Sequence, residues 1–178
     1  EDKTRNETDI IKTRITKTIE QDLRDDPYAQ EAFSQLLRKA IEDAEALFDH
    51  PLKEYMLFQE FEDQVKARQL DDIPDMFQGN QHAQAYFGIF KKELPDTFNK
   101  MEDSQYWIDL AFNLDGIVET AVSEHSINPQ NIEADIRKKL LPLLFKACKT
   151  VGGGMDQAKT IVEWVIQITR VGLSNHTA

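Results

Sequence analysis

The stretch IEADIRKKLLPLLFKACKTVGGGMDQAKTIVEWVIQITRV, residues 132–171, decides the fold of the C-terminal part of the chain. Apolar residues recur every three or four positions on both sides of three consecutive glycines, which is the spacing of amphipathic α-helices. Glycines at 152–154 end one helix and let the chain reverse, and Met155 or Asp156 starts the next helix. The stretch therefore predicts a helix over IEADIRKKLLPLLFKACK and another from about Met155 toward Val171.

The same stretch is one substitution away from the phosphate-binding loop G-x-x-x-x-G-K-[ST], because Gly153 precedes Ala158, Lys159 and Thr160 at the required spacing. Such a loop needs a buried strand before it, whereas LLPLLFKACKT has helical spacing. The Cβ of Ala158 would also crowd the phosphate cradle. We therefore expect no ATP, Mg²⁺ or other cofactor in this domain. A weaker alternative stays open, in which free amides at the helix start and Lys159 touch a DNA phosphate.

Helical periodicity also covers the rest of the chain. The first helix carries an apolar stripe: Ile11, Ile15, Ile19 and Leu23. Asp26-Pro27 has the form of a helix start, and the helix that follows carries Phe33, Leu36, Leu37, Ala40, Ile41, Ala44, Leu47 and Phe48. A third helix carries Leu52, Tyr55, Met56, Phe58, Phe61 and Val65, and two aromatic-rich helices follow at 82–94 and 104–114. We therefore expect an all-α fold, a compact irregular multi-helix domain of about six to eight helices with no significant sheet.

The domain organisation follows from length and from breaks in this pattern. A chain of 178 residues can bury one hydrophobic core, so we expect a single helical domain over residues 1–178. The stretch LDDIPDMFQGN at 70–80 breaks the periodicity, and an internal subdivision would fall there. The chain begins without Met, so we expect the helix at about 7–25 to connect it to a preceding part of a longer protein. Pro142 lies inside a helical pattern, where it should kink the helix at a cost of about 3 kcal/mol unless packing compensates.

Candidate catalytic and metal sites are absent from the sequence pattern. The four histidines have no paired ligand spacing, and each is expected to be a surface or cap residue: His50, His82, His125 and His176. Asn113–Gly116 resembles the middle of a calcium loop, but its first and last ligand positions are Ala111 and Val122. The acid-x-lysine element of a PD…(D/E)xK nuclease lies on the wrong side of Pro74-Asp75. We expect no catalytic, cofactor-binding or metal-binding residue in this chain.

Cysteine content and hydropathy bear on the compartment. Cys148 is the only cysteine, so no internal disulfide can form, and we expect this residue to be a small core residue. No apolar run approaches the roughly 20 residues that span a membrane. We therefore expect a cytoplasmic protein with no membrane partner.

Charge is distributed unevenly along the chain. The net charge of the whole chain is -11, yet residues 131–178 contain seven basic and four acidic residues, a net charge of +3. The basic residues are Arg137, Lys138, Lys139, Lys146, Lys149, Lys159 and Arg170. No acid lies between Asp135 and Asp156, and Lys139 and Lys146 lie seven apart on nearly one helical face. Composition alone favours a solvated helix face. The competing interpretation is a DNA-binding surface whose lysines contact phosphates and release counterions.

The amino-acid sequences of three segments resemble those of a known protein family. They are ITKTIEQDLRDDPYAQEAFSQLLRKAIEDAEALFDHPLKEYMLFQEFEDQV (15–65), IPDMFQGNQHAQAYFGIFKKEL (73–94) and IEADIRKKLLPLLFKACKTVGGGMDQAKTIVEWVIQITRVGL (132–173). Together they resemble the C-terminal domain of the motor (restriction, R) subunit of type I restriction-modification enzymes, over nearly the whole chain. The resemblance is one of overall amino-acid sequence along these segments, and it includes no active-site motif.

This resemblance implies a function and partners. In that family the subunit is an ATP-dependent, Mg²⁺-requiring site-specific deoxyribonuclease with a nuclease domain, two helicase-like ATPase domains and a helical region. Its C-terminal region is implicated in docking onto the methyltransferase core, made of modification and specificity subunits, and in contacting double-stranded DNA. This chain lacks the nuclease and ATPase motifs and should catalyse nothing alone. We expect assembly and non-sequence-specific DNA contact during translocation, with a purely protein-docking module as the alternative.

Overall fold

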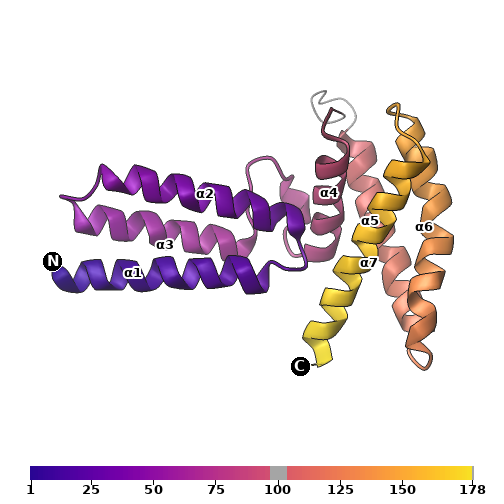
Figure 1. Cartoon of the computed structure of the whole chain (residues 1–178), viewed down its shortest axis with the longest axis horizontal. Coiled ribbons are helices and arrows are strands. Elements are labelled where there is room, and N and C mark those ends of the chain that lie inside the picture. The colour runs from indigo at the N-terminus through magenta and orange to yellow at the C-terminus, as the bar shows by residue number, and fades with distance from the viewer. Residues whose placement is uncertain (97–103, 178) are drawn as a thin grey trace. The chain divides into compact units, whose positions relative to one another are not determined.

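The computed structural model describes residues 1–96 and 104–177, with side chains to residue 174, and over these residues it contains seven α-helices and no strand (Figure 1). The predicted all-α class and the predicted number of helices are confirmed. The chain divides into two compact units, residues 1–79 (unit 1) and 80–178 (unit 2). This boundary lies at the end of the 70–80 stretch that breaks the helical periodicity.

Unit 1 contains three long helices, α1 (Asp2–Lys17), α2 (Pro27–Glu45) and α3 (Pro51–Ala67). A π-helical turn, Thr18–Asp22, extends α1, and a 3₁₀ turn, Asp75–Phe77, lies near the end of the unit. Helix α3 packs against both α1 and α2 (Figure 1). The predicted stripe of the first helix is confirmed, since Ile11, Ile15, Ile19 and Leu23 are all buried. The helix begins at Asp2, earlier than the predicted start near residue 7.

The predicted apolar side of the second helix is only partly buried. Asp26 caps α2 as expected, and its carboxylate accepts a hydrogen bond from the Ala29 N–H at 3.0 Å. Phe33 is fully buried and meets Phe61 of α3 edge to face, whereas Phe48 remains 63% exposed. Leu36 and Ile41 are also exposed. The prediction was wrong for Leu36 and Ile41 because α2 has α3 as its main helical neighbour, which covers only part of its surface. It was wrong for Phe48 because α2 ends at Glu45, before this residue.

Unit 2 contains four helices, α4 (Gln81–Glu93), α5 (Ser104–Glu124), α6 (Ile132–Lys149) and α7 (Met155–Thr177). Helices α5 and α7 each pack against α4 and α6, in a bundle whose helices alternate in direction (Figure 1). Helix α6 runs through the exposed Pro142 without a break. Cys148 is a buried core residue, as predicted, and burial raises the pKa of its thiol. Asn113–Gly116 lies inside α5, so it forms no calcium loop.

Candidate nucleic-acid interface

The seven basic residues proposed from the sequence all lie on the hairpin of α6 and α7. Each helix buries one apolar stripe: α6 buries Ile136, Leu140, Leu144 and Ala147, and α7 buries Ala158, Ile161, Val162, Val165, Ile166 and Ile168. The two stripes bring the helices together along their length. The basic residues occupy positions outside these stripes, and all seven are exposed.

The glycine turn between the helices has a helix-ending geometry. Gly152 adopts a φ of +81°, which favours glycine, and its N–H donates to Lys149 O at 3.3 Å. The Gly153 N–H donates to Cys148 O at 2.8 Å, and these two bonds together form a Schellman motif. A Cβ on Gly153 would lie only 3.1 Å from the same Cys148 oxygen. Helix α6, and not the strand that a phosphate-binding loop requires, precedes these glycines, as the sequence predicted.

The start of α7 is a poor anion site. The Gly154 N–H donates to the side-chain oxygen of Gln157 at 2.9 Å, so this amide is already occupied in a capping arrangement. Asp156 adds a negative charge in the first turn. Both features disfavour the alternative in which free amides at this helix start hold a DNA phosphate. One of the amides is already bonded, and the carboxylate of Asp156 would repel the phosphate. Lys159 lies one turn further along and remains available.

Three of the seven predicted DNA-contacting residues are held in ion pairs. Arg137 on α6 donates two hydrogen bonds to the Glu163 carboxylate on α7, at 2.9 and 3.1 Å. Lys139 lies 3.2 Å from Asp135 and 3.5 Å from Glu124. The remaining pair joins Arg170 of α7 to Glu133 of α6. The sequence between Asp135 and Asp156 contains no acidic residue, but acidic side chains from outside this stretch lie next to its basic residues in the folded chain.

Two of these ion pairs shift the pKa values of side chains that form them. Hydrogen bonds from Arg137 lower the pKa of Glu163, and the reciprocal bonds raise the pKa of Arg137. Hydrogen bonding to Asp135 and attraction by Glu124 raise the pKa of Lys139. Arg137, Glu163 and Lys139 therefore keep their charges at neutral pH. Contacting a phosphate would require them to leave a carboxylate, which reduces any net gain in binding.

The other four basic residues have no acidic partner within 4 Å among the described residues. We call them the four unpaired lysines: Lys138, Lys146, Lys149 and Lys159. Lys138 and Lys149 lie eleven residues apart, which at 3.6 residues per turn places them about 20° apart around α6. The Lys149 ammonium lies 5.1 Å from the Phe145 ring centroid. The structure thus narrows the predicted set of seven to four readily available cations.

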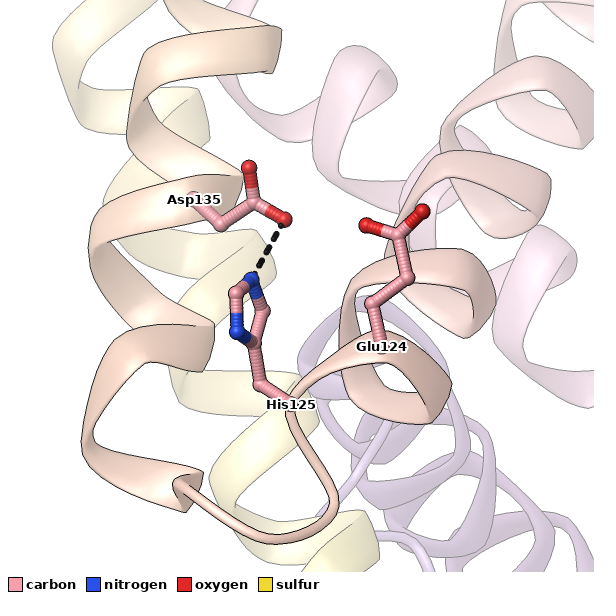
Figure 2. Close-up of side chains that lie close together, drawn as sticks. All are labelled: Glu124, His125 and Asp135. Carbon is pink, nitrogen blue, oxygen red and sulfur yellow. Dashed lines mark hydrogen bonds and ion pairs between the residues drawn. The ribbon is translucent and has the colours of Figure 1, made fainter.

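A cluster that the sequence analysis missed lies at one end of this hairpin. Glu124 ends α5, His125 follows it, and Asp135 projects from the first turns of α6 (Figure 2). His125 Nε2 lies 3.1 Å from Asp135 Oδ2, and one ligand atom from each residue lies within 4.8 Å of the others. His125 and Asp135 are separated by nine residues that include a loop, so a search for ligands at short, regular spacing could not find this arrangement.

This cluster could offer three ligands to a metal ion, but a protein cation already occupies it. Lys139 contacts both carboxylates, so its ammonium supplies the positive charge that a metal would bring. A metal would have to displace Lys139 first. Of the other histidines, His50 precedes α3 and is exposed, and His82 is half-buried on α4. The side chain of His176 lies outside the described residues.

None of the helices over the described residues combines the length and the apolar character needed to cross a membrane. Comparisons with known protein families, with curated proteins and with solved structures found no match to this chain.

Proposed function

We propose that this chain is a non-catalytic helical domain of a type I restriction enzyme motor subunit, which acts in the cytoplasm. Its role is to assemble the subunit with the methyltransferase core and to hold double-stranded DNA, without reading its sequence, during ATP-dependent translocation and cleavage. The resemblance in amino-acid sequence of residues 15–65, 73–94 and 132–173 to that family supports this proposal. ATP, Mg²⁺ and catalysis belong to the other domains of the parent subunit.

The observation that carries the DNA contact is the set of four unpaired lysines. They project from two adjoining helices of a chain whose net charge is -11, and they have no acidic partner within 4 Å among the described residues. Lysines that contact phosphates position a protein on DNA without reading bases. Their contribution should therefore be similar for every duplex and should weaken with salt.

The test replaces all four unpaired lysines by glutamate in the complete motor subunit and measures duplex affinity across a salt series. If each lysine contacts a phosphate, the slope of log affinity against log salt becomes shallower by about 0.9 per lysine lost. Affinity for unrelated duplexes should fall by similar factors. Gel filtration must show that the variant still joins the methyltransferase core.

A matched control replaces four exposed lysines of unit 1, namely Lys3, Lys17, Lys39 and Lys53, by glutamate. This control changes the net charge by the same amount as the test variant. It therefore distinguishes the loss of lysine–phosphate contacts from the effect of a more negative protein on DNA affinity. An unchanged salt slope in the assembled test variant, or an equal change in the control, would contradict the DNA contact.

A second function, docking to protein alone, is favoured by the exposed apolar side chains of unit 1. Phe48, Leu52 and Met56 are 63%, 65% and 56% exposed, and Ile10 is 58% exposed. Large exposed apolar side chains can mark protein-binding surfaces. If docking is the sole function, Phe48→Ser with Leu52→Ser should abolish assembly, while glutamate at the four unpaired lysines leaves DNA affinity unchanged.

A further inference from the structure

Unit 2 contains a pocket of about 250 Å³ where α4, α5 and α7 converge. Its walls are mainly apolar: Tyr86 comes from α4, Val118 and Val122 from α5, and Ile168 and Leu173 from α7. Gly172 has no side chain to fill the space, and a Cβ at this position would lie 3.6 Å from the His82 imidazole. The pocket therefore lies beside both an apolar surface and an imidazole.

Asp115 of α5 brings a carboxylate to this pocket. Its Oδ1 atom is buried and has no hydrogen-bond partner within the part of the chain that the structure describes. Buried polar atoms are nearly always hydrogen-bonded, because an unsatisfied one loses its hydration without compensation. The orphaned oxygen thus needs a donor that the described residues do not supply.

The charges around the pocket indicate what kind of donor fits. Asp115 and Glu119 both line it, whereas no lysine or arginine does. Burial, with a contribution from the Glu119 charge, raises the pKa of Asp115, and attraction by His82 opposes this shift. A cation in the pocket would relieve both the desolvation of Asp115 and its repulsion by Glu119. A neutral donor would relieve only the missing hydrogen bond.

We propose that this pocket binds a cationic group, an ammonium or a guanidinium, carried on a short apolar stem. The cation donates a hydrogen bond to Asp115 Oδ1, and the stem packs against Val118, Val122 and Ile168. A pocket of about 250 Å³ lies below the roughly 300–1,000 Å³ that is usual for drug-sized ligands, so it suits a short side chain or a small amine. This inference does not depend on the proposed DNA contact, since none of the four unpaired lysines lines the pocket.

The test titrates the 178-residue chain with n-butylguanidinium and, separately, with its neutral isostere n-butylurea, following the methyl NMR signals of Val118, Val122 and Ile168. The two probes match in shape and differ in charge. We expect n-butylguanidinium to bind at least about tenfold more tightly, because hydrogen bonds between charged partners are roughly twice as strong as neutral ones.

Two variants identify the carboxylate. Asp115→Asn keeps the shape of the side chain and removes its charge, so the preference for the guanidinium should fall from about tenfold to about threefold or less. The ion pair is then lost, and only a hydrogen bond from the cation to a neutral amide and the attraction of Glu119 remain. Asp109→Asn is the matched control, because Asp109 is exposed on the same helix and does not line the pocket. The control should keep the full preference.

Two sources could supply this cation, a free small molecule or a side chain of another polypeptide. A blocked glycine-rich pentapeptide with a central arginine separates them: affinity at least equal to that of n-butylguanidinium indicates a side-chain pocket, and much weaker binding indicates a free ligand. Equal binding of n-butylguanidinium and n-butylurea, or no methyl shifts with either probe, overturns the proposal. This comparison uses the unchanged chain, so it remains decisive even if Asp115→Asn fails to fold.

Discussion

Replacing the buried Asp26 by asparagine should stabilise unit 1 at neutral pH. Asp26 is 1% exposed, and its Oδ2 atom has no hydrogen-bond partner among the described residues. Its other oxygen caps α2 through the Ala29 N–H. Burial raises the pKa of Asp26 to about 6, although the Ala29 hydrogen bond and the Arg68 charge oppose this shift.

The direction of the pH dependence follows from this raised pKa. The unfolded chain releases the proton of Asp26 near pH 3.8, whereas the folded chain holds it until about pH 6. Between these values the unfolded state binds fewer protons, so stability falls as pH rises. The contribution of Asp26 is fully present below pH 3.8 and is lost as pH passes through about 6. The interval is about 2 pKa units, which at 1.36 kcal/mol per unit corresponds to about 3 kcal/mol.

Asparagine keeps the cap and removes the ionisation, because Asn and Asp are about equally good at the N-cap, the position of Asp26 immediately before α2. We therefore expect Asp26→Asn to resemble the original chain near pH 4 and to be more stable by up to about 3 kcal/mol at pH 7. Asp26→Ala is the matched comparison, since it also removes the charge but loses the cap, which costs about 1 kcal/mol.

The assay is urea unfolding at pH values from 4 to 8, followed by far-UV circular dichroism. Trp107 and Trp164 both lie in unit 2, so their fluorescence follows that unit and serves as an internal reference. An asparagine variant no more stable than the original chain at pH 7, with the same slope of stability between pH 4 and 6, would refute this reasoning. It would mean that water or local movement already relieves the buried charge.

Two further predictions concern the α6–α7 hairpin. Gly152→Ala should destabilise unit 2 by about 1–2 kcal/mol, because its φ of +81° strains any residue with a Cβ. Gly154→Ala has no positive φ to strain and should cost less, about 0.5 kcal/mol, as expected for alanine in place of glycine before the first residue of a helix; urea unfolding followed by tryptophan fluorescence distinguishes them. Glu163→Gln should change stability by less than about 1 kcal/mol, as expected for an exposed ion pair. If the hairpin contacts DNA, the released Arg137 should raise duplex affinity and steepen the salt slope by up to about 0.9, while Glu60→Gln, an exposed control in unit 1, changes neither.

The helices could be predicted from the sequence because their signals are local. Spacing by four placed Ile11 and Ile15 in the core of α1, and the Asp26-Pro27 pair marked the start of α2. The exposure of Leu36 could not be predicted in the same way, since it depends on which helices lie beside α2. Periodicity shows which face of a helix is apolar, but the positions of its neighbours decide how much of that face is covered.

The candidate sites also depend on which helices lie side by side, which the sequence of a single helix does not reveal. The histidine cluster joins His125 to Asp135 across a loop, and the cavity joins His82 of α4 to Asp115 of α5. Neither pair has a spacing that one helix could reveal. In contrast, Asp135 and Lys139 lie four residues apart on one helix, so their ion pair could have been expected from the sequence. Residues within one helix were predictable, and residues that meet across helices were not.

This difference changes the meaning of the basic run in α6. In an antiparallel hairpin, residues at similar distances from the turn face one another, and here Glu133 meets Arg170 while Arg137 meets Glu163. The acids that neutralise the basic residues therefore come from both helices of the hairpin, including the part of α6 that precedes the run, and from Glu124 at the end of α5. Nearer the turn, Lys146, Lys149 and Lys159 share their end of the hairpin with Asp156, which forms no ion pair within 4 Å among the described residues. Positive charge is thus concentrated at the turn end, and a polyanion that approaches this hairpin should meet its least neutralised part there.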